Sequence, residues 1–447
     1  MASFSIENFG CRATEADAAA LRRELLASGM TLADGHATAE VVVLNTCTVT
    51  AAADSQARDA VRKIHRANPA ARIVVTGCYA QRAPDELASL DGVSLVVGNS
   101  HQSQIPVLIR DLHLSAADAP TDFVPLARLN DDAMSLARGP AKILTGDIFA
   151  QAGVNIPVSA LADAAPADRT RPILKIQDGC NNRCSYCVIP FVRGRSRSLA
   201  PDTVIDEVRG LVAAGAREIV LSGINLGSYG RDLSPRAALG DVVRRVLDET
   251  DIERLRFSSI EPQDVTEDFV ALVASSPRIA PHFHVPLQSG ADRILRAMHR
   301  WYRAAHYAER VQLIRRLLPG AAIGADVIVG FPGESDAEFH ATTQFIAGLP
   351  FTYLHVFSFS ERPGTTAANL DARVPAQLIR ERARALCALG EQKSSEFRAS
   401  QAGRTLRALT LARGGEDWTE ALTGNYLKVR IRGRQPANEW HEVRVED

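Results

Sequence analysis

The sequence lacks any apolar run of the roughly 18–20 residues that a membrane-spanning helix needs. Its first residues, MASFSIENFG, have neither the basic start nor the apolar stretch of a signal peptide. A net charge of -1 over 447 residues gives no overall attraction to a polyanion, so any nucleic-acid site must be local. We therefore expect a cytoplasmic protein with no membrane partner.

Cysteine is scarce, but it recurs in motif-like contexts. In the cytoplasm thiols stay reduced, so cysteines in motif spacing more often bind metal or do chemistry than form disulfides. The seven cysteines are Cys11, Cys47, Cys78, Cys180, Cys184, Cys187 and Cys387.

The chain is too long for one ordinary core, so two or three domains are expected. Its composition, with 46% apolar and 23% charged residues, is that of a globular protein. The patterns described next divide it into an N-terminal domain (1–110), a linker (111–170), a central domain (171–398) and a C-terminal domain (399–447).

The first hundred residues repeat a β-like run followed by an amphipathic helix, which predicts a parallel α/β sheet. The runs FSIENFGC, AEVVVLNTC and ARIVVTGC place Cys11, Cys47 and Cys78 each at the carboxyl end of a predicted strand. Ligands bind at that edge of an open α/β sheet, so the three thiols are expected to converge there. The alternative is that each is an ordinary small buried residue.

After an Ala, Asp and Pro-rich stretch with one short ordered piece, AKILTGDIF, six further apolar runs alternate with helical segments. They predict a partial (β/α)6 barrel, whose chemistry collects at the carboxyl ends of the strands. The residues expected there are Cys180, Asn225, Glu261, Gln288 and Gly330. A closing helix (375–400) carries Cys387, predicted to be a packed thiol, and the alternating C-terminal segment predicts a small antiparallel β-barrel.

The motif CNNRCSYC presents Cys180, Cys184 and Cys187 in C-x3-C-x2-C spacing. Three thiolates on one loop can hold three irons of a [4Fe-4S] cube and leave the fourth iron open for a ligand. A zinc site completed by a distant residue, or thiols without a role, are the alternatives.

With Tyr186 before the third cysteine, CNNRCSYC resembles the signature of the radical S-adenosylmethionine (SAM) family. The resemblance implies that the open iron chelates the amino and carboxylate groups of SAM. An electron from the cluster then cleaves SAM to a 5'-deoxyadenosyl radical. It also implies a partial barrel of six units.

Nearly the whole chain resembles the methylthiotransferases, through GC, NTCTVTAAAD and TGCYAQ ahead of IQDGCNNRCSYCVIPFVRGRSRS and a terminal β domain of the TRAM type. This resemblance implies a second [4Fe-4S] cluster on Cys11, Cys47 and Cys78, beside the one on Cys180, Cys184 and Cys187. A second SAM would supply the methyl group. The family usually has an Asn within three residues of the first cysteine, whereas this chain reads CRATEAD.

Within the family, NTCTVT, IPFVRGRSRS, FSSIEP and FSFSERPGT resemble the branch that methylthiolates C2 of N6-threonylcarbamoyladenosine at position 37 of tRNA. The partners implied are a tRNA anticodon stem-loop, a sulfur donor, and an electron donor such as flavodoxin or ferredoxin. The alternatives are a methylthiotransferase for isopentenyladenosine or for a ribosomal protein side chain, and a non-catalytic RNA-binding or iron-sensing protein.

The resemblance also suggests which residues contact SAM and RNA. The SAM candidates are Tyr186, Gly223, Asn225, Glu261 and Gln288, although a polar residue at a strand end can merely cap a helix. The RNA candidates are Arg193, Arg195 and Arg197 after the cluster loop, and Lys428, Arg430 and Arg432 near Tyr426 and Trp440. A solvated loop and a half-exposed strand would show the same charges.

Overall fold

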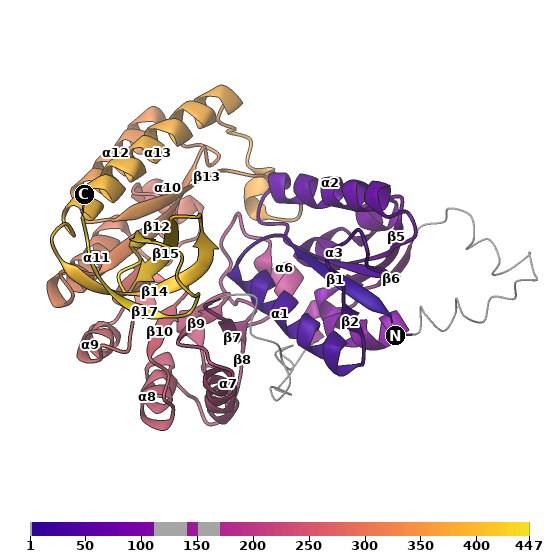
Figure 1. Ribbon diagram of the computed structural model, residues 1–447. Helices are drawn as coiled ribbons and strands as arrows, with labels where there is room; N and C mark the ends of the chain where they lie inside the picture. The colour runs from indigo at the N-terminus through magenta and orange to yellow at the C-terminus, as the bar shows by residue number, and fades with distance from the viewer. Residues whose placement is uncertain (1, 111–140, 151–169, 447) are drawn as a thin grey trace, which may run out of the picture. The chain divides into compact units, whose positions relative to one another are not determined.

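The computed structural model describes residues 2–110, 141–150 and 170–446 (Figure 1). The chain forms two compact units, the first comprising 1–160, 179–181 and 188–195, the second 161–178, 182–187 and 196–447. Most of the predicted linker lies outside the described residues. Within the part of the chain that is described, no helix is long and apolar enough to cross a membrane.

A six-stranded parallel sheet forms the centre of the first unit, as the sequence predicts. Its strands are β1 (Ser3–Asn8), β2 (Thr31–Leu32), β3 (Val41–Thr46), β4 (Arg72–Gly77), β5 (Val93–Gly98) and β6 (Lys142–Leu144). Their spatial order is β2-β1-β3-β4-β5-β6, so the order reverses between β1 and β3. Ligands of open α/β sheets bind at the carboxyl ends of the strands beside such a reversal.

Alternating side chains give this sheet two buried faces. Val41 and Val43 point to a core with α1 (Arg12–Ala27), whereas Val42 and Leu44 point to a core with α2 (Ala51–Ala67). The short helices α3 (Cys78–Arg82) and α4 (Pro84–Ala88) pack on the α2 face. Burial on both faces explains why these strands read as continuous apolar runs.

A partial barrel of six parallel strands forms the centre of the second unit and confirms the predicted fold. The strands are β7 (Ile173–Asp178), β9 (Glu218–Gly223), β10 (Arg254–Phe257), β11 (His282–His284), β12 (Ala322–Val329) and β13 (Tyr353–Ser358). The groups β10-β9-β7 and β11-β12-β13 are joined by a parallel bridge between Ser259 and His284. The two-residue β8 (Arg197–Ser198) pairs antiparallel with β7.

Helices alternate with these strands along the chain, and the helices bury part of their own side chains. They are α7 (Pro201–Ala213), α8 (Leu239–Glu249), α9 (Glu267–Ser275), α10 (Asp292–Ala297), α11 (Ala304–Leu317), α12 (Asp336–Gly348) and α13 (Ala376–Ala399). On α13 the buried positions are Arg382, Leu386, Gly390 and Lys393. Cys387 lies one position away from that stripe and is exposed, which corrects the prediction of a packed thiol.

The C-terminal residues form the predicted small antiparallel β domain as a curled four-stranded sheet, with spatial order β16-β15-β14-β17. Its strands are β14 (Thr405–Gly414), β15 (Trp418–Thr423), β16 (Lys428–Arg432) and β17 (Trp440–Arg444). Arg256 of β10 attaches this sheet to the barrel, since it donates to the carbonyl oxygens of Thr423 and Gly424 at 3.0 Å each. The same guanidinium donates to Glu218 at 2.8 Å.

Candidate active site

Three cysteines follow neighbouring strands of the first unit at one edge of the sheet. Cys11 comes after β1, Cys47 after β3, and Cys78 directly after β4. A Cβ on Gly10 would lie 2.4 Å from the Cβ of Cys47, and Gly10 has a φ of +133°. Glycine before Cys11 therefore lets the ends of β1 and β3 approach closely.

The thiols of this edge influence one another's ionisation. A hydrogen bond from the Cys47 thiol is the main reason that the pKa of Cys11 falls to about 5. The same hydrogen bond raises the pKa of Cys47, and burial and the nearby Cys78 raise it further. Burial raises the pKa of Cys78, against the opposing effect of Arg193. The three predicted ligands thus lie close together in the structure.

Two donors from outside the strands reach Cys78. Arg193, the last residue of α6 (Ile189–Arg193), donates from Nε to Cys78 Sγ at 3.2 Å and from Nη2 to Asp17 at 2.7 Å. The amide of Asn99 lies 3.6 Å from the same sulfur. Hydrogen bonds from a charged donor favour the thiolate form that binds metal.

The three arginines that the sequence predicts as RNA contacts lie in different environments. Arg193 is buried against Asp17 and Cys78. Arg197 is also buried, on β8. Arg195 is the exposed member of the trio. Arg193 and Arg197 are thus buried and Arg195 is exposed, and contact of these arginines with RNA stays a prediction.

In the second unit, Ser185 holds the loop that contains Cys184 and Cys187. Its amide donates to the carbonyl of Met298 at 3.0 Å and its hydroxyl to that of Ala297 at 2.8 Å. Arg300 donates to Cys184 Sγ at 3.3 Å. Tyr186 packs against an apolar cluster that includes Met298 and Phe331. The segment after α10 therefore fixes this part of the cysteine loop.

In the first unit, Cys180 is held separately, by a hydrogen bond from its amide to the carbonyl of Gly194 at 3.1 Å. The preceding Gly179 has a φ of +69°, and a Cβ there would lie 2.0 Å from the carbonyl oxygen of Arg195. The seven cysteines all lie in the described part of the chain, and none of them forms a disulfide. Six thiols in two sets of three are a donor set suited to iron–sulfur clusters.

The predicted SAM residues lie at the carboxyl ends of the barrel strands. Gln177 of β7 accepts from the amide of Asn225 at 2.8 Å, and a Cβ on Gly223 would lie 2.8 Å from the same oxygen. Gln288, after β11, has a φ of 67° and donates from its amide to the carbonyl of Asp326 at 2.8 Å. Sequence reasoning missed Gln177, which a buried polar residue inside the run ILKIQD could have indicated.

Glu261, another predicted SAM residue, is paired with Arg300. Burial raises the pKa of Glu261, and Arg300 opposes that effect. Arg300 therefore contacts both Cys184 and Glu261, and it links the cysteine loop to the end of β10. The sequence analysis did not single out Arg300.

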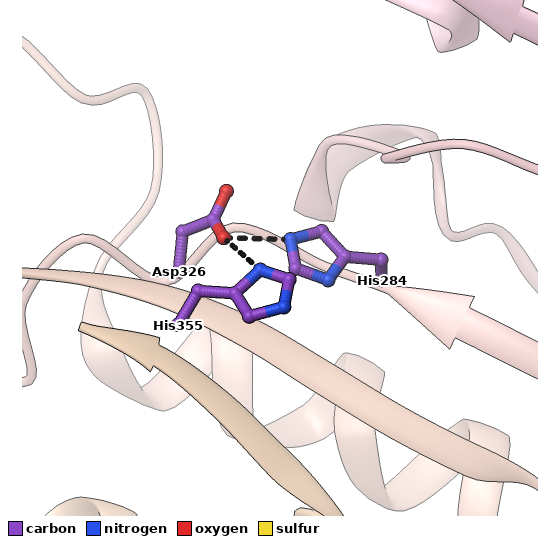
Figure 2. A group of neighbouring side chains, drawn as sticks. All are labelled: His284, Asp326 and His355. Atoms are coloured by element: carbon purple, nitrogen blue, oxygen red, sulfur yellow. Dashed lines mark hydrogen bonds and ion pairs between the residues drawn. The ribbon is translucent and has the colours of Figure 1, made fainter. Parts of the chain in front are cut away.

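Figure 2 shows a further group inside the barrel strands, made of His284, Asp326 and His355. They come from β11, β12 and β13, and Asp326 Oδ1 lies 2.9 Å from His284 Nε2 and 3.2 Å from His355 Nδ1. Burial raises the pKa of Asp326, but hydrogen bonds from both histidines outweigh it and hold the pKa below its usual range. The signal in the sequence was a polar residue inside each of three apolar runs.

The C-terminal sheet presents the predicted basic strand to solvent. Lys428, Arg430 and Arg432 are all exposed on β16, and Arg430 lies over the ring of Trp418 at 4.5 Å. Tyr426 instead stacks on His282, with ring centroids 4.3 Å apart. Trp440 is contacted by Arg254 and Arg407. Tyr426 and Trp440 therefore both connect the C-terminal sheet to the barrel. Trp440 also contacts Arg407 of β14 in the same sheet.

Comparisons with known proteins agree with this organisation. Residues 3–98 match the family described as "Uncharacterized protein family UPF0004", and residues 174–346 match the Radical SAM superfamily. The fold resembles the radical S-adenosylmethionine methyltransferase TsrM from Kitasatospora setae, with a TM-score of 0.58 and 16% identity. That likeness covers 82% of this chain and 77% of TsrM. Membership of the Radical SAM superfamily implies SAM and a [4Fe-4S] cluster.

Three named relatives match over most of this chain. The chain is 35% identical to "Threonylcarbamoyladenosine tRNA methylthiotransferase MtaB" of Aquifex aeolicus, over 96% of each chain. It is 34% identical to the protein of the same name in Bacillus subtilis, over 97% of this chain and 91% of that one. "tRNA-2-methylthio-N(6)-dimethylallyladenosine synthase" of Thermobifida fusca is 34% identical, over 91% and 77%. The chain therefore belongs to the radical SAM methylthiotransferases, enzymes that transfer a methylthio group, as its cysteine motifs predict.

Proposed function

We propose that this enzyme methylthiolates C2 of N6-threonylcarbamoyladenosine at position 37 of tRNA, with SAM and two [4Fe-4S] clusters. The observation that carries the proposal is the meeting of Cys11, Cys47 and Cys78 at the strand reversal of the first unit, because an ordinary radical SAM enzyme has no need of it. The names of the relatives in Aquifex aeolicus and Bacillus subtilis support the substrate.

The auxiliary cluster would be held by Cys11, Cys47 and Cys78, and the radical cluster by Cys180, Cys184 and Cys187. When bound, the radical cluster supplies the electron that cleaves SAM, and the auxiliary cluster supplies the site at which sulfur is attached. The protein itself contributes donors to the sulfurs. Arg193 and Asn99 donate hydrogen bonds to the sulfur of Cys78, and Arg300 donates one to the sulfur of Cys184. These hydrogen bonds stabilise negative charge on the ligand sulfurs.

We further propose that residues at the carboxyl ends of the barrel strands orient SAM. Gly223 leaves room for backbone to approach a ligand, and Asn225, Glu261 and Gln288 offer hydrogen-bonding groups at adjacent strand ends. Tyr186 is packed in an apolar cluster, where it supports the cysteine loop. Excluding water from this region would protect a carbon radical from competing hydrogen donors.

The tRNA anticodon stem-loop would be contacted by Arg195 and by the exposed basic residues of β16. Exposed arginines and lysines on a small β domain suit the phosphates of loop RNA. Flavodoxin or ferredoxin would supply electrons, and a separate sulfur donor would restore the auxiliary cluster.

The test uses full-length protein with both clusters reconstituted anaerobically, and follows SAM cleavage and nucleoside products by mass spectrometry. Cys184→Ala should lose SAM cleavage, whereas Cys47→Ala should cleave SAM without inserting sulfur. Cys387→Ser is the matched control because Cys387 is exposed on α13, and it should retain both activities. Methylthiolation by Cys47→Ala would refute the auxiliary site.

Substrate choice is tested with tRNAs that differ in one modification. The proposal expects product from tRNA carrying threonylcarbamoyladenosine and little from tRNA carrying isopentenyladenosine. The reverse preference would support the alternative named for the Thermobifida fusca relative. Modification of a ribosomal protein, with neither tRNA modified, would favour a protein substrate.

A further inference from the structure

A cluster of potential metal ligands lies inside the barrel, apart from every cysteine assigned above. His284, Asp326 and His355 project from three adjacent strands, and their ligand atoms all lie within 4.8 Å of one another (Figure 2). We propose that these three side chains form a mononuclear site for a divalent transition metal, with Zn²⁺ as the best-suited ion. Two imidazole nitrogens and one carboxylate oxygen are a recurrent donor set for zinc.

The spacing of the ligand atoms suits such an ion. Bonds of about 2.0–2.2 Å in a tetrahedral site place neighbouring ligand atoms about 3.3–3.5 Å apart. The Asp326 oxygen is 2.9 Å from His284 Nε2 and 3.2 Å from His355 Nδ1. The two distances from Asp326 therefore need to lengthen by only a few tenths of an ångström, and all three ligand atoms already lie within 4.8 Å of one another. Asp326 pairs directly with His355 across β12 and β13, whereas His284 of β11 pairs with Gly324, two residues before Asp326.

Tyr353 provides the outer support that metal-bound histidines usually have. Its hydroxyl lies 3.1 Å from His284 Nδ1 and 2.8 Å from His282 Nε2. If Nε2 of His284 binds an ion, its Nδ1 carries a proton and donates to Tyr353, whose own proton is donated to His282. This arrangement fixes the ring and raises its basicity as a ligand. His282, the last residue in this series of hydrogen bonds, is held in place by stacking on Tyr426.

The site has both a buried and an open side. The side chain of His284 is 7% exposed, that of Asp326 is 23% exposed and that of His355 is 53% exposed. Solvent can therefore reach His355 and the Asp326 carboxylate, and a water molecule can complete the coordination. A site with three protein ligands and one exchangeable position is typical of zinc that binds or activates a small molecule. The competing arrangement holds protons between the histidines and Asp326 in place of the ion.

Metal analysis of the full-length, cluster-loaded protein distinguishes the two arrangements. The protein is equilibrated with Zn²⁺, desalted and analysed for zinc, iron and sulfide, and its affinity is measured by competition with a chromophoric chelator. We expect about one zinc per chain, and at least tenfold weaker binding in His355→Ala. Tyr353→Phe should weaken binding by about 10–100-fold, since it removes an outer-shell partner.

Matched variants separate this site from the cysteines and from loss of the fold. His340→Ala, at an exposed position of α12, should bind zinc as the unmodified protein does. His355 is itself exposed, so its truncation leaves the barrel folded, and unchanged iron and sulfide contents verify that. Equal zinc affinities of the unmodified protein and His355→Ala would place the ion elsewhere and overturn the proposal. Absence of zinc from the unmodified protein would establish the protonated arrangement instead.

Discussion

Replacing Arg193 by alanine tests how the first unit holds its cysteine edge. The guanidinium and its partner Asp17 are both almost fully buried, with side chains 2% and 1% exposed. Removing one member of a buried ion pair costs about 3–5 kcal/mol, because the remaining charge is left without compensation. We therefore expect Arg193→Ala to reduce the opening free energy of the first unit by that amount. At 1.36 kcal/mol per tenfold change, exchange should accelerate by about two to four orders of magnitude.

Hydrogen exchange read by mass spectrometry measures this effect on peptides that contain β3 and β4. The reduced protein is used before reconstitution, so that a cluster does not mask the loss. Arg195→Ala is the control because Arg195 is exposed two residues away, and its peptides should exchange at the normal rate. Adding Asp17→Asn to Arg193→Ala should restore part of the protection by removing the buried carboxylate that has lost its guanidinium partner. Equal exchange in Arg193→Ala and Arg195→Ala would refute this reasoning.

Three further predictions follow from features described above. Changing the three basic residues of β16 to glutamine should weaken tRNA binding and reduce the salt dependence of the affinity, both measured by filter binding. An unchanged dependence of affinity on salt concentration would exclude contacts between these residues and phosphate groups. Hydrogen bonding to Arg293 lowers the pKa of Glu338 to about 2, so its contribution to folding is present above its ordinary pKa of 4.5 and is lost as pH falls toward 2. Glu338→Gln should therefore unfold with a weaker pH dependence in that range, measured by circular dichroism. Gly77→Ala should lose the auxiliary iron while retaining SAM cleavage, because a Cβ there would lie 2.3 Å from the carbonyl oxygen of Thr46 at a φ of +99°; a full iron content would contradict the close packing.

Local patterns in the sequence predicted the strands, the partial barrel and the positions of six cysteines. Each of these depends on an apolar run and the residue that ends it, so the information lies within a few consecutive residues. Cys11, Cys47 and Cys78 could be grouped without a structure because parallel strands end at the same edge of a sheet. Membership of the family was accordingly readable from the motifs.

Contacts between distant segments could not be predicted in this way. Arg193 stands in an arginine-rich loop that resembles a solvated surface, yet its buried partner Asp17 is 176 residues away in the sequence. Tyr426 is a second example of such a contact. It stacks on His282 and so joins two domains that were predicted separately from the sequence. The prediction of a packed Cys387 was wrong for a different reason. The buried face of α13 runs through Leu386 and Gly390, so it lies one residue away from Cys387.

The attachment of the C-terminal sheet has a consequence for how the protein is made. Arg256 is fully buried in the barrel, and two of its acceptors are carbonyl oxygens of Thr423 and Gly424. A nascent chain that ends before these carbonyls leaves the buried Arg256 guanidinium paired with Glu218 but without two of its acceptors, which has a cost in free energy. The contact between Arg256 and the C-terminal sheet therefore forms only after the chain has been synthesised past Gly424. A chain truncated before Thr423 would therefore lose a contact inside the barrel as well as the rest of the C-terminal sheet.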